Sequence, residues 1–411
     1  MQLRNFVGAS CFLLLISGCS WFGWLPWVGD GEEDGESKDE PAELTSIEAE
    51  VDVERVWSAS IGDGLGKKYL ELSPAVLADR VFAADAYGLV EARDRFDGKR
   101  LWRVHVGAPE ADSFFDFTSR RDPSFVMGGV GAGEGLVLLG TARAEVIALS
   151  AVDGTELWRT KVSSEVVSPP VASGDLVFAQ TTDGRLLALD RETGAQRWSF
   201  DTQVPILTLR GSATPVVDGA MVYAGFATGK VHAFRAATGE PVWEQRVMLP
   251  QGRSELDRIV DVDGTPIISG PVLYAASYQG RLKALRVADG NELWERDVSS
   301  YLDLAAGYGQ VYVVDDHDVI HAIDQSTAEV VWEQRALYRR GLSSPVVFSS
   351  YLIVTDAEGY LHVLAQSDGR LVGRRKVDGD GVRSRTAAAD EMLYCLGNGG
   401  KLVAYRIEPR G

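Results

Sequence analysis

Three histidines occupy corresponding positions in a repeated phrase of this sequence, and by residue type they could bind a transition metal. His232, His321 and His362 each lie three residues after the start of their copy of the phrase. In the ring of repeats inferred below, equivalent positions are related by rotation about the ring axis, and third strands lie far from that axis. The three side chains therefore cannot converge on one ion, and we expect no metal site.

Other chemistry-bearing motifs are incomplete. Asp261-Val262-Asp263-Gly264 is similar to the start of a calcium loop, but Val272 stands where that loop needs a bidentate glutamate. Asp315 to Asp318 fits a turn between strands. The chain has no Gly-x-Ser-x-Gly, no phosphate-binding loop and no Gly-x-Gly-x-x-Gly between a strand and a helix. We expect no catalytic residues and no cofactor.

The element that positions these residues is a repeated β-hairpin. The clearest copy spans residues 183–198, DGRLLALDRETGAQRW, with a strand at 185–190, a turn at Gly194 and a return strand from Gln196. Gly194 stands where the hairpin loop needs a positive φ, which glycine adopts without steric cost. Similar phrases begin at residues 88, 144, 229, 280 and 318; a copy at 359–373 lacks the closing tryptophan, and one at 400–407 stops before its last strand.

The period of the repeat predicts the fold. From Trp57 to Gly373 there are seven steps of about 45 residues, which is typical of four-stranded sheets repeated around a ring. In the copy around Gly194 we expect strands at 166–172, 176–180, 185–190 and 196–200. Glu54 to Trp57 can supply the strand that the last copy lacks. The sequence thus predicts an all-β, eight-bladed β-propeller of four-stranded antiparallel blades over 55–407, closed by its N-terminal strand, with the repeat tryptophans packed between blades.

The N-terminus has the features of a lipoprotein signal. A basic Arg4, an apolar run too short to span a membrane and the lipobox Ile16 to Cys19 predict a signal peptide over 1–18, with Cys19 acylated. Ser20 favours sorting to the outer membrane. Residues 19–54 are rich in Asp and Glu and predict a solvated tether. Its Trp21, Trp24 and Trp27 either lie at the membrane interface or belong to a disordered tail that happens to be aromatic.

The net charge restricts the classes of partner, and two long connections are candidate contact surfaces. The net charge of −18 argues against nucleic acid. Cys395 is the one cysteine outside the N-terminal signal and lipobox, and we expect it to be buried. The stretch 108–128, with Phe114, Phe115 and Phe117, predicts either a lid over one end of the ring or a contact surface. A second insertion, 252–266, is expected to face residues 204–215.

The hairpin phrase A-L-D-x-x-T-G-x-x-x-W is similar to the repeat of quinoprotein alcohol dehydrogenases, which bind pyrroloquinoline quinone; those enzymes carry adjacent cysteines that this chain lacks. The chain more closely resembles the BamB family, lipoproteins of the outer-membrane β-barrel assembly machinery. The resemblance covers nearly all of the chain after the signal. It is most specific in LTLRGSATP (207–215) and ELDRIVDVDGTP (255–266), beside 60–92 and 343–364.

That resemblance implies a non-enzymatic scaffold at the periplasmic face of the outer membrane. It would bind a POTRA domain of BamA, the central barrel protein, and help deliver and insert β-barrel proteins. The implied contacts are Leu207, Leu209, Arg210, Asp261 and Asp263. Arg210 could instead pair internally with Asp261 or Asp263 and join the two loops. Alternatives are a periplasmic quinoprotein oxidoreductase and a peptidoglycan- or sugar-binding lipoprotein. The outer strands could also bind unfolded substrate segments by β-addition.

Overall fold

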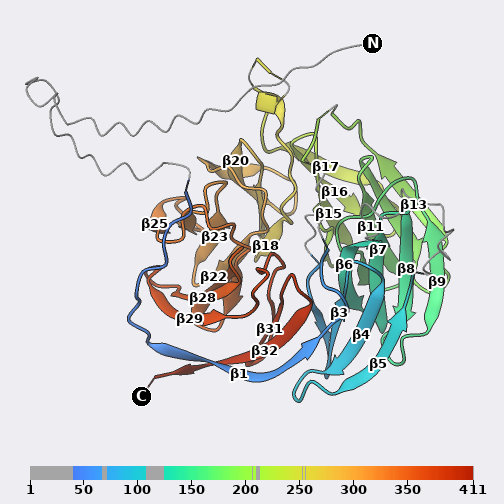
Figure 1. Cartoon of the computed structure of the whole chain (residues 1–411). Helices are drawn as coiled ribbons and strands as arrows, with labels where there is room; N and C mark the ends of the chain where they lie inside the picture. Colours follow the sequence, from blue (N-terminus) through green and yellow to red (C-terminus); the bar gives the residue numbers. More distant parts are fainter. Residues whose placement is uncertain are drawn as a thin grey trace, which may run out of the picture. The chain divides into compact units, whose positions relative to one another are not determined.

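The computed structural model describes residues 40–66, 72–107, 125–205, 207–209, 213–251, 253–254 and 256–410. The chain divides into two units, Met1–Glu40 and Pro41–Gly411, and the strands of the described residues all belong to the second. These strands form eight separate four-stranded antiparallel sheets arranged in a ring (Figure 1). The predicted eight-bladed propeller is confirmed.

Each blade is given from its inner to its outer strand. Blade 1 has β2 (Ala75–Leu77), β3 (Arg80–Ala84), β4 (Leu89–Asp94) and β5 (Arg100–His105); blade 2 has β6 (Val126–Gly133), β7 (Leu136–Thr141), β8 (Glu145–Ser150) and β9 (Glu156–Lys161). Blade 3 has β10 (Val171–Ser173), β11 (Leu176–Thr181), β12 (Arg185–Asp190) and β13 (Gln196–Asp201); blade 4 has β14 (Val216–Asp218), β15 (Met221–Phe226), β16 (Lys230–Arg235) and β17 (Pro241–Arg246).

Blade 5 has β18 (Ile267–Ser269), β19 (Val272–Ala276), β20 (Arg281–Arg286) and β21 (Glu292–Asp297); blade 6 has β22 (Ala305–Gly307), β23 (Gln310–Val314), β24 (Ile320–Asp324) and β25 (Val330–Gln334). Blade 7 has β26 (Val346–Phe348), β27 (Tyr351–Thr355), β28 (Tyr360–Ala365) and β29 (Leu371–Lys376); blade 8 has β30 (Ala387–Ala389), β31 (Met392–Leu396), β32 (Lys401–Pro409) and β1 (Val51–Ser60). The described residues include one short 3-10 helix, η1 (Leu256–Arg258), and among them no helix is long and apolar enough to cross a membrane.

The inner strand of blade 3 is shorter than expected. The sequence predicted a strand at 166–172, whereas β10 pairs with β11 over three residues, from Val171 to Ser173. Pro169 and Pro170 have no N–H to donate to a ladder, so the strand begins only after them. The other three strands of the blade begin at the predicted residues, and Gly194 has the expected positive φ of 70°.

The ring is closed by the N-terminal strand, as predicted. β1 pairs antiparallel with β32, from Val51 opposite Pro409 to Ser60 opposite Lys401, with a bulge between Arg55 and Trp57. The strand begins at Val51, three residues before the expected Glu54. Joining the two ends of the chain in one sheet removes the free edge that an open ring would leave.

The repeat tryptophans join each blade to the next. Trp198 Nε1 donates to the Ala236 carbonyl at 2.9 Å, and its ring lies so close to Gly239 that a Cβ there would be 2.5 Å from Trp198 Cδ2. Gly239 also has a φ of +72°. The same hydrogen bond is made by Trp57, Trp102, Trp158, Trp243, Trp294 and Trp332, each to a hairpin of the following blade. The predicted packing between blades is confirmed.

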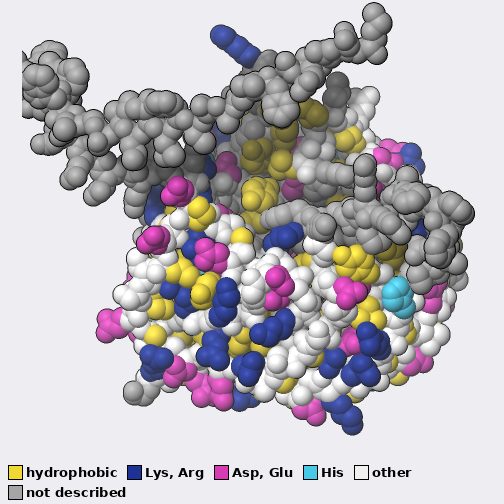
Figure 2. Space-filling model, in the orientation of Figure 1, with side chains coloured by type: hydrophobic (Ala, Val, Ile, Leu, Met, Phe, Trp, Pro, Cys, Tyr) yellow, Lys and Arg dark blue, Asp and Glu magenta, His cyan; other side chains and the backbone are white. Residues whose placement is uncertain are grey.

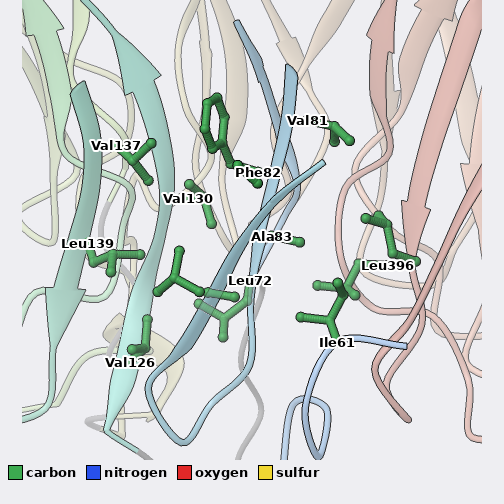
Figure 3. Close-up of a cluster of buried hydrophobic side chains, with 14 of the residues drawn as sticks. Ile61, Leu72, Val81, Phe82, Ala83, Val126, Val130, Val137, Leu139 and Leu396 are labelled. Carbon is green, nitrogen blue, oxygen red and sulfur yellow. The ribbon is translucent and has the colours of Figure 1, made fainter. Parts of the chain in front are cut away.

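Blade 7 lacks this tryptophan because β1 fills its place. A Cβ on Gly373 would be 2.7 Å from Val51 Cγ2, and the neighbouring Val372 is 1% exposed. The start of the closing strand thus covers the site at which the other outer strands place an indole ring. Buried aliphatic side chains complete the interfaces between blades. Figure 3 shows one such cluster, formed by blades 8, 1 and 2, with Ile61, Leu72, Phe82, Val126, Val137 and Leu396 among its members.

The ring has two distinct faces. The hairpin face carries the turns between the first and second strands of each blade and between the third and fourth strands of blades 1 to 7; in blade 8 it carries the start of β1 and the end of β32. The connection face carries the turns between second and third strands and the connections from one blade to the next. A channel of about 1010 Å³ opens between the inner strands, lined by residues that include Ala75, Thr214, Ile267, Ala305, Val346 and Ala387.

Candidate functional site

Two neighbouring connections on the connection face form the candidate site. One joins β13 to β14 and contains Leu207 and Leu209; the other joins β17 to β18 and contains Asp261 and Asp263. Leu207 is 41% exposed and Leu209 is 39% exposed. Arg210, the third implied contact of the first connection, lies outside the described residues. Two large apolar side chains therefore face solvent on this connection.

Asp261 holds the first connection in place from the second. The residue is fully buried, and its Oδ2 accepts a hydrogen bond from Leu209 N at 2.6 Å. Its backbone carbonyl accepts from Tyr278 N at 3.0 Å. Burial raises the pKa of the carboxyl to about 6, although the Leu209 hydrogen bond acts in the opposite direction. Oδ1 has no hydrogen-bond partner among the described residues.

The second connection is itself fixed by apolar side chains. Val260 and Val262 flank Asp261 and are 2% and 1% exposed. Val262 packs where Gly225 has no side chain, since a Cβ on that glycine would be 2.5 Å from Val262 Cγ1. Val262 N also lies within hydrogen-bonding distance of the Phe226 carbonyl, at 3.3 Å. Asp261 is thus held between two anchored valines.

Asp263 lies at a different part of the site, because it lines the central channel. Close by, Asp303 accepts from Thr265 N at 2.7 Å through Oδ1 and pairs with Arg385 at 3.1 Å through Oδ2. Thr214 N donates to Thr265 Oγ1 at 3.2 Å, which joins the two connections a second time. The structure therefore brings Leu209 and Asp261 together and places Asp263 at the mouth of the channel.

Sequence reasoning did not single out two further exposed leucines on the second connection. Leu249 is 55% exposed, and Leu256, in η1, is 65% exposed with its carbonyl accepting from Gln279 Nε2 at 3.1 Å. In the sequence Leu256 is an apolar residue within the polar stretch 252–258, whereas Leu249 lies beside Met248, ahead of the predicted insertion. Figure 2 shows apolar side chains gathered in the upper part of this view, above a lower half in which basic and acidic side chains alternate.

The histidines of the repeat do not come together. His232 is buried against Phe226 and Phe234, and desolvation lowers its pKa to about 4. His321 Nε2 lies 3.0 Å from Asp315 Oδ2, and His362 Nε2 lies 2.9 Å from Asp356 Oδ2. His232 also contacts Phe200 of blade 3, at 5.3 Å between ring centroids, whereas the carboxylates beside His321 and His362 belong to their own blades.

One group in the described chain has donor atoms close enough for a metal: Asp315, Asp316 and His317. It lies in the turn between β23 and β24, where Asp315 Oδ1 accepts from His317 N and Val319 N. Two exposed members and these turn hydrogen bonds agree with a structural turn.

Cys395 lies in β31, the second strand of blade 8. Cys395 is free and fully buried, and burial raises the pKa of its thiol to about 12. Cys19, the tryptophans that follow it and the stretch with Phe114, Phe115 and Phe117 lie outside the described residues.

Fold and site together define a class of protein. The ring of blades built on one hairpin phrase is a β-propeller of the quinoprotein-like repeat class, and the candidate site is a pair of connections on one face. The fold is also that of quinohemoprotein alcohol dehydrogenase from Comamonas testosteroni, with a TM-score of 0.66 at 14% identity, covering 86% of this chain and 76% of that one. A similarity at this identity shows the fold alone.

Closer relatives define the family. The family model described as outer membrane protein assembly factor BamB matches residues 86–334 and 316–409. BamB of Pseudomonas aeruginosa is 48% identical over 367 residues, covering 89% of this chain and 92% of that protein. BamB of Escherichia coli is 36% identical over 405 residues, covering 98% and 99%. The crystal structure of BamB from Moraxella catarrhalis superposes with a TM-score of 0.76 at 29% identity, over 86% of this chain and all of that one. The chain belongs to the BamB family of outer membrane protein assembly factors.

Proposed function

We propose that this protein is a non-catalytic scaffold of outer-membrane protein assembly that binds a POTRA domain of BamA. The proposed contact surface consists of Leu207, Leu209 and Arg210, supported by Asp261 and Asp263. The names of the relatives support the process, since each is called an outer membrane protein assembly factor. The observation that carries the site is the pairing of exposed Leu209 with buried Asp261.

The geometry suits a binding surface for a physical reason. Apolar side chains that remain exposed in the free protein can anchor a partner, because their burial is completed only in the complex. Asp261 and the valines beside it fix the backbone of Leu209 in advance, which lowers the entropy lost on binding. The guanidinium of Arg210 would add charge-assisted hydrogen bonds to a carboxylate or carbonyl of the partner.

The location in the cell is part of the same proposal. Residues 1–18 would be removed as a signal peptide, acyl chains on Cys19 would enter the outer membrane, and the residues after Cys19 would connect this anchor to the propeller, whose closing strand β1 begins at Val51, at the periplasmic face. Mass spectrometry of the mature N-terminus tests this part. An acylated Cys19 is the expected result, and an unmodified chain with an intact signal would contradict it.

Calorimetry with the periplasmic POTRA region of BamA from the same organism tests the contact surface. The protein from Ser20 onward should bind, and Arg210→Glu should bind at least ~10-fold more weakly, a loss of about 1.4 kcal/mol. Arg185→Glu is the matched control, because it makes the same charge change at a half-buried position on the third strand of blade 3, where Arg185 pairs with Asp183 and Asp201. Circular dichroism confirms folding of all three proteins.

The outcomes separate the partner from the site. If the wild-type protein does not bind, the scaffold proposal fails. If all three proteins bind equally, BamA is a partner but the surface lies elsewhere. Loss of binding in both variants would indicate a general effect of charge rather than a contact at Arg210.

The central channel favours one alternative, a pyrroloquinoline-quinone oxidoreductase. Its volume of about 1010 Å³ and the shared fold of the quinohemoprotein enzymes support the idea. A ligand that binds the native state raises the melting temperature, by about 2.7 kcal/mol of added stability at a hundredfold excess over Kd. An unchanged melting temperature with saturating quinone would exclude this alternative.

Unfolded barrel substrates are a second class of partner that we propose for the outer strands. Leu101, Leu157 and Leu293 occupy equivalent exposed positions in β5, β9 and β21, at the outer edge of their blades. An extended apolar segment could add to such an edge. Photo-crosslinkers at these three positions should capture substrate, and a crosslinking map without contacts at the blade edges would contradict β-addition.

A further inference from the structure

Residues 41–50, here called the strap, lie against blade 7 before the chain enters β1. The strap is part of the same unit as the propeller. Its residues alternate in burial: Ala42, Leu44, Ile47 and Ala49 are half-buried, whereas Glu43, Glu48 and Glu50 are exposed. This alternation is that of an extended chain with one side on a surface.

The C-terminal end of the strap is fixed at the hairpin face. Glu50 N donates to the Val372 carbonyl at 2.8 Å, and the Glu50 carbonyl accepts from Arg410 N at 2.8 Å. Arg370 forms a bidentate pair with the Glu50 carboxylate, with both N–O distances 2.8 Å. A bidentate pair of this kind fixes the relative orientation of the two side chains as well as their contact.

The N-terminal end is fixed at the connection face. Ala42 N donates to the Tyr338 carbonyl at 2.9 Å, and the Ala42 carbonyl accepts from Arg340 Nη1 at 2.8 Å. Arg340 is buried, and its guanidinium also pairs with the buried Asp356 at 2.8 Å. The donor that holds Ala42 is therefore itself held by a buried ion pair.

Two contacts lie between these ends. Arg374 Nη1 donates to the Thr45 carbonyl at 2.9 Å. Leu44 packs against the buried cluster that includes Leu302, Leu337 and Leu342. The strap is thus held along its length by backbone hydrogen bonds and by one apolar anchor.

The direction of β1 shows from which face the chain would leave the ring without the strap. Val51 lies opposite Pro409 at the hairpin face, and Ser60 lies opposite Lys401 beside the turn at 397–400 on the connection face. A chain that left β1 directly would depart from the hairpin face. The strap reverses this direction and brings Pro41 to the connection between blades 6 and 7; Figure 1 shows this segment in blue, running along the blade to the start of β1.

We propose that the strap makes the N-terminal segment leave the ring from the face that carries Leu207, Leu209 and Asp261. This inference rests on the function proposed above, because it assumes an N-terminal membrane anchor and a partner at these connections. The strap then turns the connection face toward the membrane that holds both the anchor and the partner. Release of the strap would free ten more residues, about 35 Å of extended chain, and would move the point of departure to the hairpin face.

The experiment uses Leu44→Glu/Ile47→Glu to release the strap. Phe96→Glu/Val152→Glu is the control, because it places two glutamates at exposed apolar positions on other blades. Hydrogen exchange at the amides of Ala42 and Glu50 reports the strap directly. Both amides should be protected in the wild-type and control proteins and unprotected in the strap variant. Unprotected amides in the wild-type protein would overturn the inference.

Function is then measured with and without the anchor. In solution, the chain from Ser20 onward should bind the POTRA region with the same affinity in all three forms, since the strap lies outside the site. In the full acylated chain, a photo-crosslinker at Leu207 should capture the membrane-embedded partner about 10-fold less in the strap variant, because tethering raises effective concentration only where geometry permits. Equal capture despite a released strap would overturn the inference. Absence of wild-type binding in solution would contradict the proposed function itself, while exchange would still decide whether the strap is bound.

Discussion

The backbone N–H of Leu209 donates to the carboxylate of Asp261 at 2.6 Å, across 52 residues of sequence and from one inter-blade connection to the next. The donor residue is partly exposed and the acceptor residue is fully buried. A single buried acceptor therefore determines where an exposed leucine lies. Desolvation of the Asp261 carboxylate lowers the free energy of unfolding, and the size of this loss depends on pH.

Asp261→Asn should remove a pH-dependent loss of stability. The pKa of Asp261 is raised from 3.8 to about 6 by burial, so the folded state retains a proton that the unfolded chain has released. Stability from this group is fully present below pH 3.8 and is lost as pH rises to 6. Asn accepts the same hydrogen bond without charge, so its advantage over the wild type should grow by about 2 kcal/mol between pH 4 and pH 7.

Urea unfolding of both proteins at several pH values measures this difference. Parallel stability curves would contradict the prediction, and they would mean that a cation such as Arg210 compensates the carboxylate. Asp261→Ala is a useful companion, because it loses the acceptor as well as the charge. It should increase hydrogen exchange at Leu209, whereas the Asn variant should not.

Gly290→Ala should destabilise the protein more than Gly270→Ala, although both glycines belong to blade 5. Their φ values, +72° and +58°, impose a similar backbone cost on alanine. A Cβ on Gly290 would be 2.6 Å from Trp243 Cε3, whereas one on Gly270 would meet nothing within 4 Å. Because the backbone costs are similar, the difference between the urea midpoints of the two variants measures the steric clash with Trp243. Equal midpoints would refute close packing of Trp243 against Gly290.

Trp243→Ala should itself cost about 3–5 kcal/mol, the usual range for a buried aromatic residue. It removes both the ring and the hydrogen bond to the Val287 carbonyl. In the double variant with Gly290→Ala, the two costs should not add, since the ring that obstructs the new methyl group is gone. Additive costs in this cycle would show that the two residues do not interact.

The repeat made most of the fold predictable from local sequence. Gly194 and Trp198 indicated a hairpin and its packing, because both are read within one copy of the phrase. The length of β10 was not predicted correctly, since Pro169 and Pro170, which have no N–H to donate to the ladder, were read as part of the strand. The strap was not predicted because its glutamates led to the interpretation of a solvated tether. The alternation of Ala42, Leu44, Ile47 and Ala49 was therefore not recognised.

The candidate site was predictable as a list of residues but not as a geometry. Resemblance to the BamB family named Leu209 and Asp261, yet only the folded ring shows that one is exposed and the other buried. Their contact joins separate connections, so no local pattern could reveal it. Leu249 and Leu256 were missed for a similar reason, because the sequence of an irregular connection does not show which of its apolar residues face solvent.

Gly373→Trp should disrupt the protein although it restores the consensus of the repeat. Val51 already occupies the space of the indole, with its Cγ2 2.7 Å from the position of a Cβ on Gly373. We expect faster hydrogen exchange at Val53 and a lower urea midpoint, because the start of β1 must move away. Arg375→Trp, at an exposed position on the same strand, is the control and should leave both unchanged. A stabilised Gly373→Trp variant would contradict this explanation of the missing tryptophan.

Cys395 should react with a maleimide only when the propeller unfolds. The side chain has no exposed surface, lies 3.4 Å from the Thr386 hydroxyl, and its thiol has a pKa raised to about 12 by burial. Both the access and the thiolate that the reaction needs are therefore absent in the folded state. In the chain from Ser20 onward this is the one cysteine, so labelling followed by mass spectrometry gives a direct rate. Ser349→Cys in a Cys395→Ser background, with an exposed thiol, calibrates the unhindered reaction. The wild-type rate should be far slower, should rise with urea and should be faster in Gly290→Ala; a rate equal to that of the control would show that blade 8 opens without global unfolding.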